Sequence, residues 1–467
     1  MIASAILDGP LGTRIPGRVR RVAERAVLNS MRFQPARQHV TVSPGTPTAS
    51  LAAVGDIALH FPKQVPGGVD PRRVVEGVAP LLRSADLRLG NLETVFTTGL
   101  APDGPAGRWF LSADPRMVET LLAGGFDAVT CANNHALDFG ERGLAESLEV
   151  LAQHGVRACG AGSTDEDARA PALMEARGLR VGMLGYGDFT NREGTPGAGP
   201  HPADSEDDRV IADVRRLRER VDLVVLQLHW GQEVAMHPLL SHRDRARRFA
   251  EAGADVVLCH HAHVIMAVEA WGRSVIAHGL GNFIFGWKPP RGHGWINRAF
   301  VLGVHFNAAG VTSAEIIPTG TTEAHGTEVL TGVARREVLG AGHVLAQKLH
   351  DDAYLWRVER DCLIRRTGVH LRRLALLARQ DDEAGVAERT ALLRSPHQQR
   401  LFAALRSRPI DGGPELAAYL ERVAESADSP RAALAAAHEA ARDPVARLRR
   451  NLLAISRPEE KKLGRVP

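Results

Sequence analysis

Three histidines within four positions are the feature that most constrains this chain. They lie in Cys259-His260-His261-Ala262-His263, between the apolar runs 256–258 and 264–268. Each imidazole has two ring nitrogens that need partners, so histidines clustered at the end of a buried strand are costly unless a metal ion or an anion lies beside them. A polar turn that carries histidines by chance is the alternative reading. The cluster predicts a binding site at a strand end, which other parts of the chain must complete.

The 467-residue chain has an α/β pattern from residue 50 to 318, where short apolar runs alternate with amphipathic helices. The expected strands are 51–54, 86–89, 127–131, 156–159, 222–228, 255–258, 274–278, 299–306 and 311–317, with a hairpin formed by 172–176 and 179–185. The expected helices are 71–83, 115–123, 141–154, 204–220 and 241–252. In such a sheet the carboxyl ends of the strands face one crevice, where binding groups gather.

Polar side chains follow several of these strands, and we expect them to converge. They are Asp56, Glu93, Asn134, His135, His229, His261 and His263. Each motif alone is weak, since Gly55-Asp56 is as typical of a turn as of a ligand, and the hypothesis rests on their joint occurrence. Carboxylate, amide and imidazole ligands suit Mn, Fe, Zn or Mg. Their number exceeds the need of one ion, which predicts two divalent ions, about 3.5–4 Å apart, that activate a water and stabilise an oxyanion.

The polar residues belong to a series of short motifs, which are Gly55-Asp56-Ile57, Asn91-Leu92-Glu93, Asn133-Asn134-His135-Ala136-Leu137-Asp138, His229-Trp230-Gly231, His260-His261-Ala262-His263 and Leu280-Gly281-Asn282-Phe283. In this order the motifs resemble those of the CapA family of bacterial capsule and poly-γ-glutamate synthesis proteins, over about residues 50–318. The resemblance implies a calcineurin-like metallophosphoesterase fold, a four-layer α/β/β/α sandwich. It also implies a part in making, exporting or trimming an anionic polymer such as poly-γ-glutamate.

The resemblance also assigns roles to single residues. It implies that Asp56 and His263 bind one metal, and that Asn134, His229 and His261 bind the other. Glu93 is expected to bridge the two ions, because a carboxylate neutralises two cations better than an amide does. His135 is expected to act as general acid or to orient the scissile group. Asn91, Asn133, His260 and Asn282 are secondary candidates.

Three positions depart from the pattern. Ala58 stands where the wider superfamily has a histidine, two residues after the first aspartate. Cys259 stands where a glycine usually precedes the paired histidines, and Ala262 where the family often has proline. The first metal site is therefore expected to lack a ligand, to bind weakly or to be empty. Cys259 is read as a hydrophobe at a strand end, with a functional thiol as the less favoured alternative.

The flanking regions and the composition limit the other possibilities. Residues 1–49 are expected to form a basic extension with a helix over 18–33 and a linker, and residues 319–467 a helical appendage with a basic tail. The 58 basic and 54 acidic residues give a net charge of only +4, too mild to argue for nucleic acid. No apolar stretch reaches the roughly 20 residues of a membrane span. Four cysteines without a CxxC pair favour a reducing cytoplasm.

Three functions stay open at this stage. The first is a metal-dependent hydrolase of a phosphoester, or of an amide in a γ-glutamyl-like compound. The second is a non-catalytic assembly or binding component that works with partner proteins in a polymer-synthesis complex. The third is a tailoring enzyme for a small γ-glutamyl or phosphorylated metabolite. The loops 99–108 and 191–202 carry no readable specificity, so the substrate is not determined.

Overall fold

The computed structural model describes residues 39–61, 68–103, 109–188, 199–285, 294–322, 326–360 and 362. The predicted helix 18–33, parts of the loops 99–108 and 191–202, and the helices expected after residue 362 lie outside the described residues. The contacts divide the chain into two units, and every element below belongs to the first unit, which includes residues 14–192 and 196–356.

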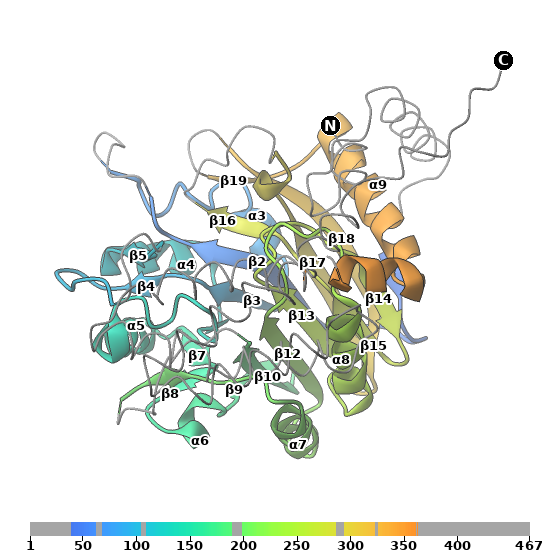
Figure 1. Ribbon diagram of the computed structural model, residues 1–467, viewed down its shortest axis with the longest axis horizontal. Coiled ribbons are helices and arrows are strands. Elements are labelled where there is room, and N and C mark those ends of the chain that lie inside the picture. Colours follow the sequence, from blue (N-terminus) through green and yellow to red (C-terminus); the bar gives the residue numbers. More distant parts are fainter. Residues whose placement is uncertain are drawn as a thin grey trace, which may run out of the picture. The chain divides into compact units, whose positions relative to one another are not determined.

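The first of two large sheets has nine strands (Figure 1). Their order is β1 (His39–Thr41), β18 (Gly310–Thr321), β17 (Arg298–Asn307), β2 (Ala49–Ala58), β3 (Leu87–Leu92), β6 (Ala128–Thr130) and β7 (Arg157–Cys159), while β16 (Asn282–Phe285) pairs with β2 and β19 (Thr327–Val329) with β18. The strands β2, β3, β6 and β7 run parallel to one another. Their carboxyl ends therefore lie at one edge of this sheet.

The second large sheet has six strands. Their order is β14 (Val268–Trp271), β15 (Ser274–Ala277), β13 (Val256–His260), β12 (Leu223–His229), β10 (Leu179–Gly187) and β9 (Ala172–Ala176). The four central strands are parallel, and β9 pairs with β10 as the predicted antiparallel hairpin. Two small sheets complete the set, made of β4 (Val95–Phe96) with β5 (Ser112–Ala113) and β8 (Ala161–Gly162) with β11 (His201–Pro202).

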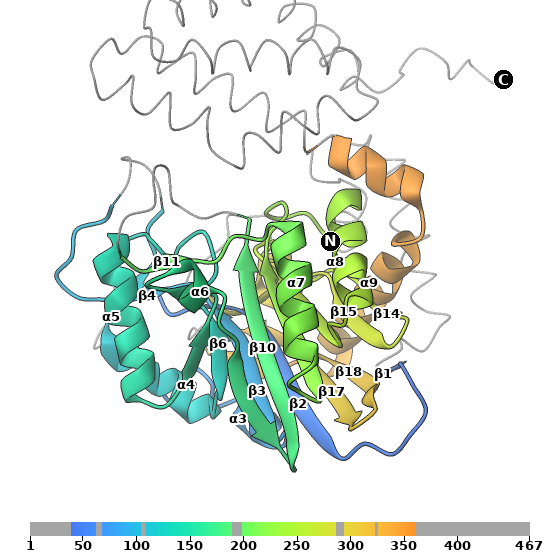
Figure 2. The ribbon, with the colours of Figure 1, turned by 90° about the horizontal axis from the view of Figure 1, so that it is seen from below.

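Helices cover the outer face of each sheet, and the two inner faces pack on each other (Figure 2). The first sheet is covered by α3 (Ala79–Arg83), α4 (Val118–Gly124) and α5 (Gly140–Gln153), and the second by α7 (Asp207–Arg218) and α8 (Leu240–Glu251). Alternation along β2 shows the layering, since Leu51 and Ala53 face the second sheet and Ala52 and Val54 face the helices. The predicted four-layer α/β/β/α sandwich is confirmed.

The structure differs from the sequence-based expectation at three places. Of the helix predicted over 71–83, only Ala79–Arg83 is α-helical, and residues 71–78 form turns. Gly77 accounts for this, because a helix-weakening glycine here lets the chain approach the backbone of Thr327 closely. The first sheet also extends past the proposed domain boundary at residue 318, through the end of β18 and through β19. At the other end, β1 falls within the segment assigned to the extension and is too short to be recognised by its pattern.

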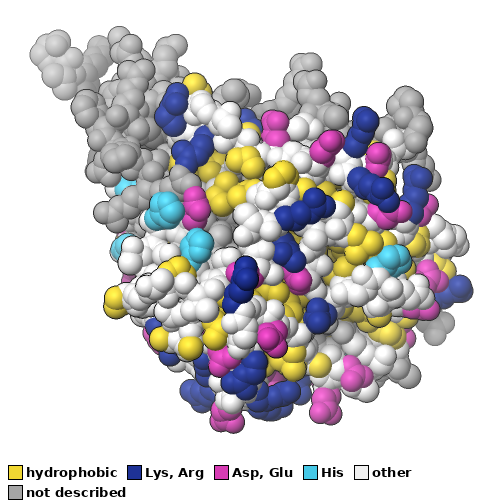
Figure 3. Space-filling view, turned by 180° about the vertical axis from the view of Figure 1, so that it is seen from behind, with side chains coloured by type: hydrophobic (Ala, Val, Ile, Leu, Met, Phe, Trp, Pro, Cys, Tyr) yellow, Lys and Arg dark blue, Asp and Glu magenta, His cyan; other side chains and the backbone are white. Residues whose placement is uncertain are grey.

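Charges of both signs are interspersed over the face shown in Figure 3. Elsewhere or on this face, charged side chains of the protein form pairs, for example Arg177 with Asp86 at 2.7 Å and Arg180 with Asp222 at 3.0 Å. Such exposed pairs contribute little to stability.

Among the helices in the described ranges, none combines the length and the hydrophobicity that crossing a bilayer requires.

His237, in the loop after β12, is a buried imidazole, and in the part of the chain that the structure describes its two ring nitrogens have no hydrogen-bond partner. It packs edge-on against the Tyr354 ring, with 4.9 Å between the ring centroids. Burial, together with a smaller effect of the nearby Lys348 ammonium, lowers the pKa of His237 from 6.5 to about 4. Between these two values the unfolded chain binds a proton that the folded protein does not bind. The free energy of unfolding therefore falls as the pH is lowered through this range.

We expect His237→Phe to remove this part of the acid sensitivity while keeping the ring contact with Tyr354. Between pH 7 and pH 5 the variant should lose about 2 kcal/mol less of its free energy of unfolding than the wild type. Denaturant titrations at the two pH values measure this difference. His350→Gln, which alters an exposed histidine, is the control and should match the wild type. Equal losses in His237→Phe and the wild type would contradict the prediction.

Candidate metal centre

A β-bulge turns Asp56 toward the second sheet. The pairing of β2 with β3 shifts register between Ala53 and Asp56, which adds a residue and makes Asp56 rather than Gly55 continue the inward face. A Cβ on Gly55 would overlap the carbonyl oxygen of Gly281, so this position requires glycine. The Asp56 N–H donates to that same carbonyl at 3.0 Å. Contacts with Gly281 thus fix the Gly55-Asp56 pair within the strand.

The histidines come from the adjacent parallel strands β12 and β13. His229 continues the inward face that Leu223 and Val225 begin. Beyond β13, His261 and His263 both have a left-handed backbone, with φ of 84° and 57°. This conformation is uncommon for residues other than glycine and tends to occur at functional sites. The tight turn brings both imidazoles back toward the ends of β2 and β3.

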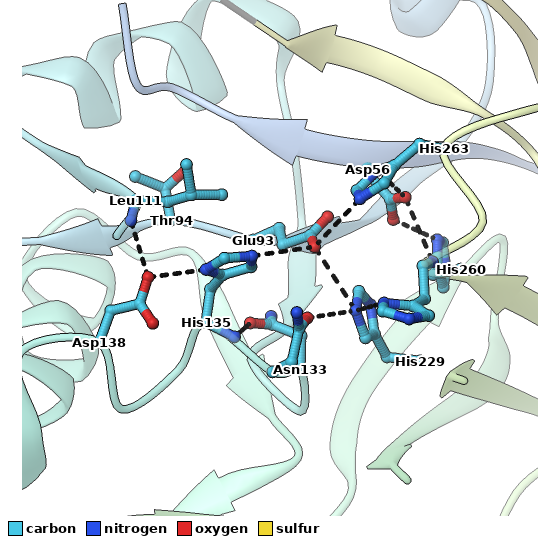
Figure 4. Close-up of polar contacts among 12 residues, drawn as sticks. Asp56, Glu93, Thr94, Leu111, Asn133, His135, Asp138, His229, His260 and His263 are labelled. Atoms are coloured by element: carbon cyan, nitrogen blue, oxygen red, sulfur yellow. Dashed lines mark hydrogen bonds and ion pairs between the residues drawn. The ribbon is translucent and has the colours of Figure 1, made fainter. Parts of the chain in front are cut away.

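Two groups of side chains have ligand atoms within 4.8 Å of one another, and Glu93 belongs to both. The His229 group is Glu93, His229 and His261, and the Asp56 group is Asp56, Glu93 and His263. Glu93 Oε1 lies 3.5 Å from His229 Nε2 and 3.8 Å from His263 Nε2 (Figure 4). Both carboxylate oxygens of Glu93 are buried, and neither has a hydrogen-bond partner among the described residues. The Glu93 carboxylate could therefore meet a cation on either side.

His135 and Asn134 lie at the edge of the His229 group. Asn134 Oδ1 is 2.7 Å from His229 Nε2, so its amide oxygen could join that group as a further ligand. His135 Nδ1 is 2.7 Å from Asp138 Oδ2, and its Nε2 is 3.9 Å from Glu93 Oε1. The Asp138 carboxylate also accepts from the Leu111 N–H at 2.7 Å. Asp138 therefore holds the His135 ring with Nε2 turned to the centre.

The secondary candidates surround these ligands without belonging to either group. Asn91 Nδ2 donates to Asp56 Oδ1 at 2.9 Å, and Asn133 Nδ2 lies 3.3 Å from Asn91 Oδ1. Asn282 Oδ1 lies 2.9 Å from His263 Nδ1. A partner on Nδ1 leaves Nε2 of that ring for an ion, as is usual for metal-binding histidines. These residues thus orient the proposed ligands.

The electrostatics of the centre call for added positive charge. Burial, reinforced by the Asp56 carboxylate, raises the pKa of Glu93 well above its usual range. Burial would lower the pKa of His263, but Glu93 and Asp56 outweigh it and raise that pKa to about 10. Burial would also raise the pKa of Asp56, yet His260 and His263 hold it well below its usual range. Divalent cations would take the place of the protons that the centre otherwise retains.

Neutral imidazole is the form that binds metals, and burial favours it at His229, whose pKa lies well below its usual range. Cys259 is buried as well, and burial raises the pKa of its thiol to about 12. A thiol with such a pKa is inert as a nucleophile or ligand at neutral pH. Cys259 is therefore a hydrophobe at a strand end, which is the interpretation that the sequence favoured.

Two residues of the centre had no role assigned from the sequence. Asp138 stands in the quoted motif, and its spacing of three residues after His135 in a tight turn was the available signal. Gln227 is fully buried on β12, and its Oε1 lies 2.9 Å from His260 Nε2. The available signal was its spacing from His229, because a polar residue two positions earlier in a strand lies on the same face.

Known proteins resemble this chain in sequence. A family model described as bacterial capsule synthesis protein PGA_cap matches residues 50–287. The PGA biosynthesis protein CapA of Bacillus subtilis (strain 168) is 28% identical over 319 residues, which cover 66% of this chain and 80% of that protein. The capsule biosynthesis protein CapA of Bacillus anthracis is 24% identical over 299 residues, or 62% of this chain and 71% of that protein. A Mycobacterium tuberculosis protein named "Probable polyglutamine synthesis accessory protein" is 29% identical over 234 residues, or 47% of this chain and 60% of that protein.

Solved structures resemble it more distantly. A hypothetical protein from Thermus thermophilus matches with a TM-score of 0.39 and 16% identity, over 58% of this chain and 98% of that one. The 5'-nucleotidase from Candida albicans matches with a TM-score of 0.33 and 10% identity, over 69% of this chain and 59% of that one. At these scores the likeness does not bear on the function of the centre.

Proposed function

The chain belongs to the PGA_cap family of bacterial capsule synthesis proteins, and on that basis we propose that it is a metal-dependent hydrolase of the phosphoesterase type. It would serve the synthesis of poly-γ-glutamate or a related anionic polymer, in keeping with the names of its Bacillus relatives. The four free cysteines, all buried, favour a reducing compartment, and we place the protein in the cytoplasm.

The observation that carries the proposal concerns the Glu93 carboxylate. Its two oxygens are buried between two groups of proposed ligands, and within the described residues they accept no hydrogen bond. A buried carboxylate in this state is costly unless it is protonated or meets a cation. The donor set, imidazole with carboxylate and amide, fits Mn, Fe, Zn or Mg. One ion would lie in the His229 group with Asn134, and the other in the Asp56 group. When bound, such ions supply Lewis-acid activation of water and of the substrate oxyanion.

The protein's own contribution to proton transfer would come from His135. Asp138 fixes the ring through Nδ1, and Nε2 then faces the centre at 3.9 Å from Glu93 Oε1. From there Nε2 can give a proton to the leaving oxygen of a phosphoester that binds between the two groups. The buried setting of Glu93 and His229 keeps bulk water from the ligands.

A non-catalytic role in assembly is the second candidate, and one observation favours it. Ala58, buried in β2, offers no ligand, so the Asp56 group contains a single imidazole. If that group binds no ion, the centre could serve to hold partner proteins or a polymer rather than to hydrolyse. A small γ-glutamyl or phosphorylated metabolite is the alternative substrate to a polymer.

Metal analysis followed by an activity assay tests the proposal. The purified full-length chain is loaded with Mn²⁺ or Zn²⁺, its ion content is measured, and it is assayed with generic phosphomonoester and phosphodiester substrates. We expect two ions per chain and hydrolysis that a chelator stops. Less than one ion per chain after reconstitution would favour the assembly role. Two ions without hydrolysis of any phosphoester would move the proposal to the amide substrates.

Asp138→Asn tests the role of His135 indirectly, by changing the residue that holds its ring. The His135 ring and the Leu111 N–H both contact Asp138 Oδ2, and an amide oxygen in its place would carry no negative charge, so it would hold the His135 ring less firmly. We expect turnover to fall about 10- to 100-fold with the ion content unchanged. The pH profile of turnover should shift as well, which a merely destabilised variant would not show. An unchanged rate and profile would exclude Asp138 from the mechanism.

A further inference from the structure

His260 is the last residue of β13 and lies beside His229 of β12 in the register of the second sheet. Its side chain is fully buried, yet it belongs to neither the His229 group nor the Asp56 group. Figure 4 places its ring on the side of Asp56 that is turned away from Glu93. His260 is thus a further buried imidazole from the same motif, and it has no role in the proposed function.

The His260 ring is held at both nitrogens. Nε2 lies 2.9 Å from Gln227 Oε1, and the Gln227 amide in turn donates to Met183 of β10. Nδ1 lies 3.1 Å from Asp56 Oδ1, close enough for a charge interaction, although it makes no hydrogen bond within the described part of the chain. These contacts run from β10 across β12 and β13 of the second sheet to β2 of the first. His260 therefore links the two sheets through Asp56.

The contacts divide the Asp56 carboxylate into two halves. Oδ1 is engaged by His260 and by Asn91, which donates at 2.9 Å. Oδ2 lies 3.4 Å from His263 Nδ1 and accepts from the His261 N–H at 3.3 Å. The two side chains on Oδ1 therefore help to fix the orientation of Asp56, and with it the direction of Oδ2.

This matters most for the Asp56 group, because Ala58 leaves it with a single imidazole. With few ligands, affinity depends on how well those present are fixed before the ion arrives, and partners of the ligands commonly change affinity 10- to 100-fold. We infer that His260, fixed by Gln227, is a positioning residue that holds Asp56 across the two sheets and sets the affinity of the Asp56 group for its ion. The inference rests on the proposed function, since it concerns one of the two ions proposed there.

Titration of the metal-free protein with Mn²⁺ tests the inference. We expect two classes of bound ion in the wild type. His260→Gln should weaken one class about 10- to 100-fold and leave the other unchanged. Gln227→Met, which frees the ring without altering any proposed ligand, should weaken the same class by a smaller factor. His154→Gln, at an exposed position on α5's carboxyl end, is the matched control and should bind as the wild type does.

Pulsed electron paramagnetic resonance of the Mn²⁺-saturated proteins separates positioning from ligation by counting coordinated imidazole nitrogens. The count should be the same in the wild type and in His260→Gln. A loss of one nitrogen in the variant would make His260 a ligand and overturn the inference, as would unchanged affinities in both variants. A wild type that binds no Mn²⁺ would instead contradict the proposed function itself. Circular dichroism of each variant establishes that the fold is kept, and Gln227→Met decides the matter if His260→Gln does not fold.

Discussion

Replacing Glu93 with glutamine is expected to release both ions and to reduce hydrolysis at least 10²- to 10³-fold, on the order of the loss that follows removal of one charge-stabilising group. Glu93 is the residue that the His229 group and the Asp56 group share, so this one change removes a proposed ligand from both. Glutamine has nearly the same shape but no charge. Ion content per chain and turnover under metal saturation measure the effect.

The same variant should cost little stability in the absence of metal. The pKa of Glu93 is raised well above its usual range, so burial disfavours the charge of this carboxylate in the metal-free centre, and glutamine removes the charge while keeping the shape. We therefore expect equal melting temperatures for metal-free Glu93→Gln and metal-free wild type, and a rise on adding metal for the wild type alone. Glu149→Gln, an exposed change on α5, is the control. Two tightly bound ions in Glu93→Gln would show that Glu93 does not bridge.

His135→Gln should lower turnover 10²- to 10⁴-fold, the usual contribution of a positioned acid or base, while both ions stay bound. The expected split between rate and ion content follows from the geometry, because His135 Nε2 faces the centre but lies outside both groups of ligands. The limb of the pH–rate profile that reports the acid should disappear with the ring. Turnover over a range of pH values, with ion content measured on the same samples, tests this.

The matched control for this variant is again an exposed histidine, His154, changed to glutamine. A substrate with a very acidic leaving group needs no proton from the protein, so the defect of His135→Gln should shrink with such a substrate. A drop in ion content would instead make His135 a ligand. Full activity with all substrates would remove His135 from the proposed mechanism.

Much of the centre could be predicted because its residues follow parallel strands. Strands that run together end together, so the polar residues after β2, β3, β6, β12 and β13 were expected to meet, and the structure brings Asp56, Glu93 and His229 together. The layering could be predicted as well, since alternation separates the inner from the outer face of each strand. The roles of these residues as ligands stay proposals.

What could not be predicted depends on contacts between residues far apart in the chain. The bulge before Asp56 exists because Gly281 approaches the backbone of Gly55, which no local pattern announces. The role of Gln227 becomes visible only through its contact with His260, on the neighbouring strand. The turns that replace a helix over 71–78 follow from the approach of Gly77 to the backbone of Thr327. In each case tertiary packing overrides the local signal.

The proposed ligands are divided between the sheets, with Asp56 and Glu93 on one and His229, His261 and His263 on the other. A cation at this seam would join the two sheets as well as serve as a cofactor, because ligands from both sheets would bind it. Its release would remove that link between the sheets at this edge. Chelation should thus loosen the protein where substrate enters, and metal supply in the cell would govern how long the chain survives proteolysis as much as how fast it works.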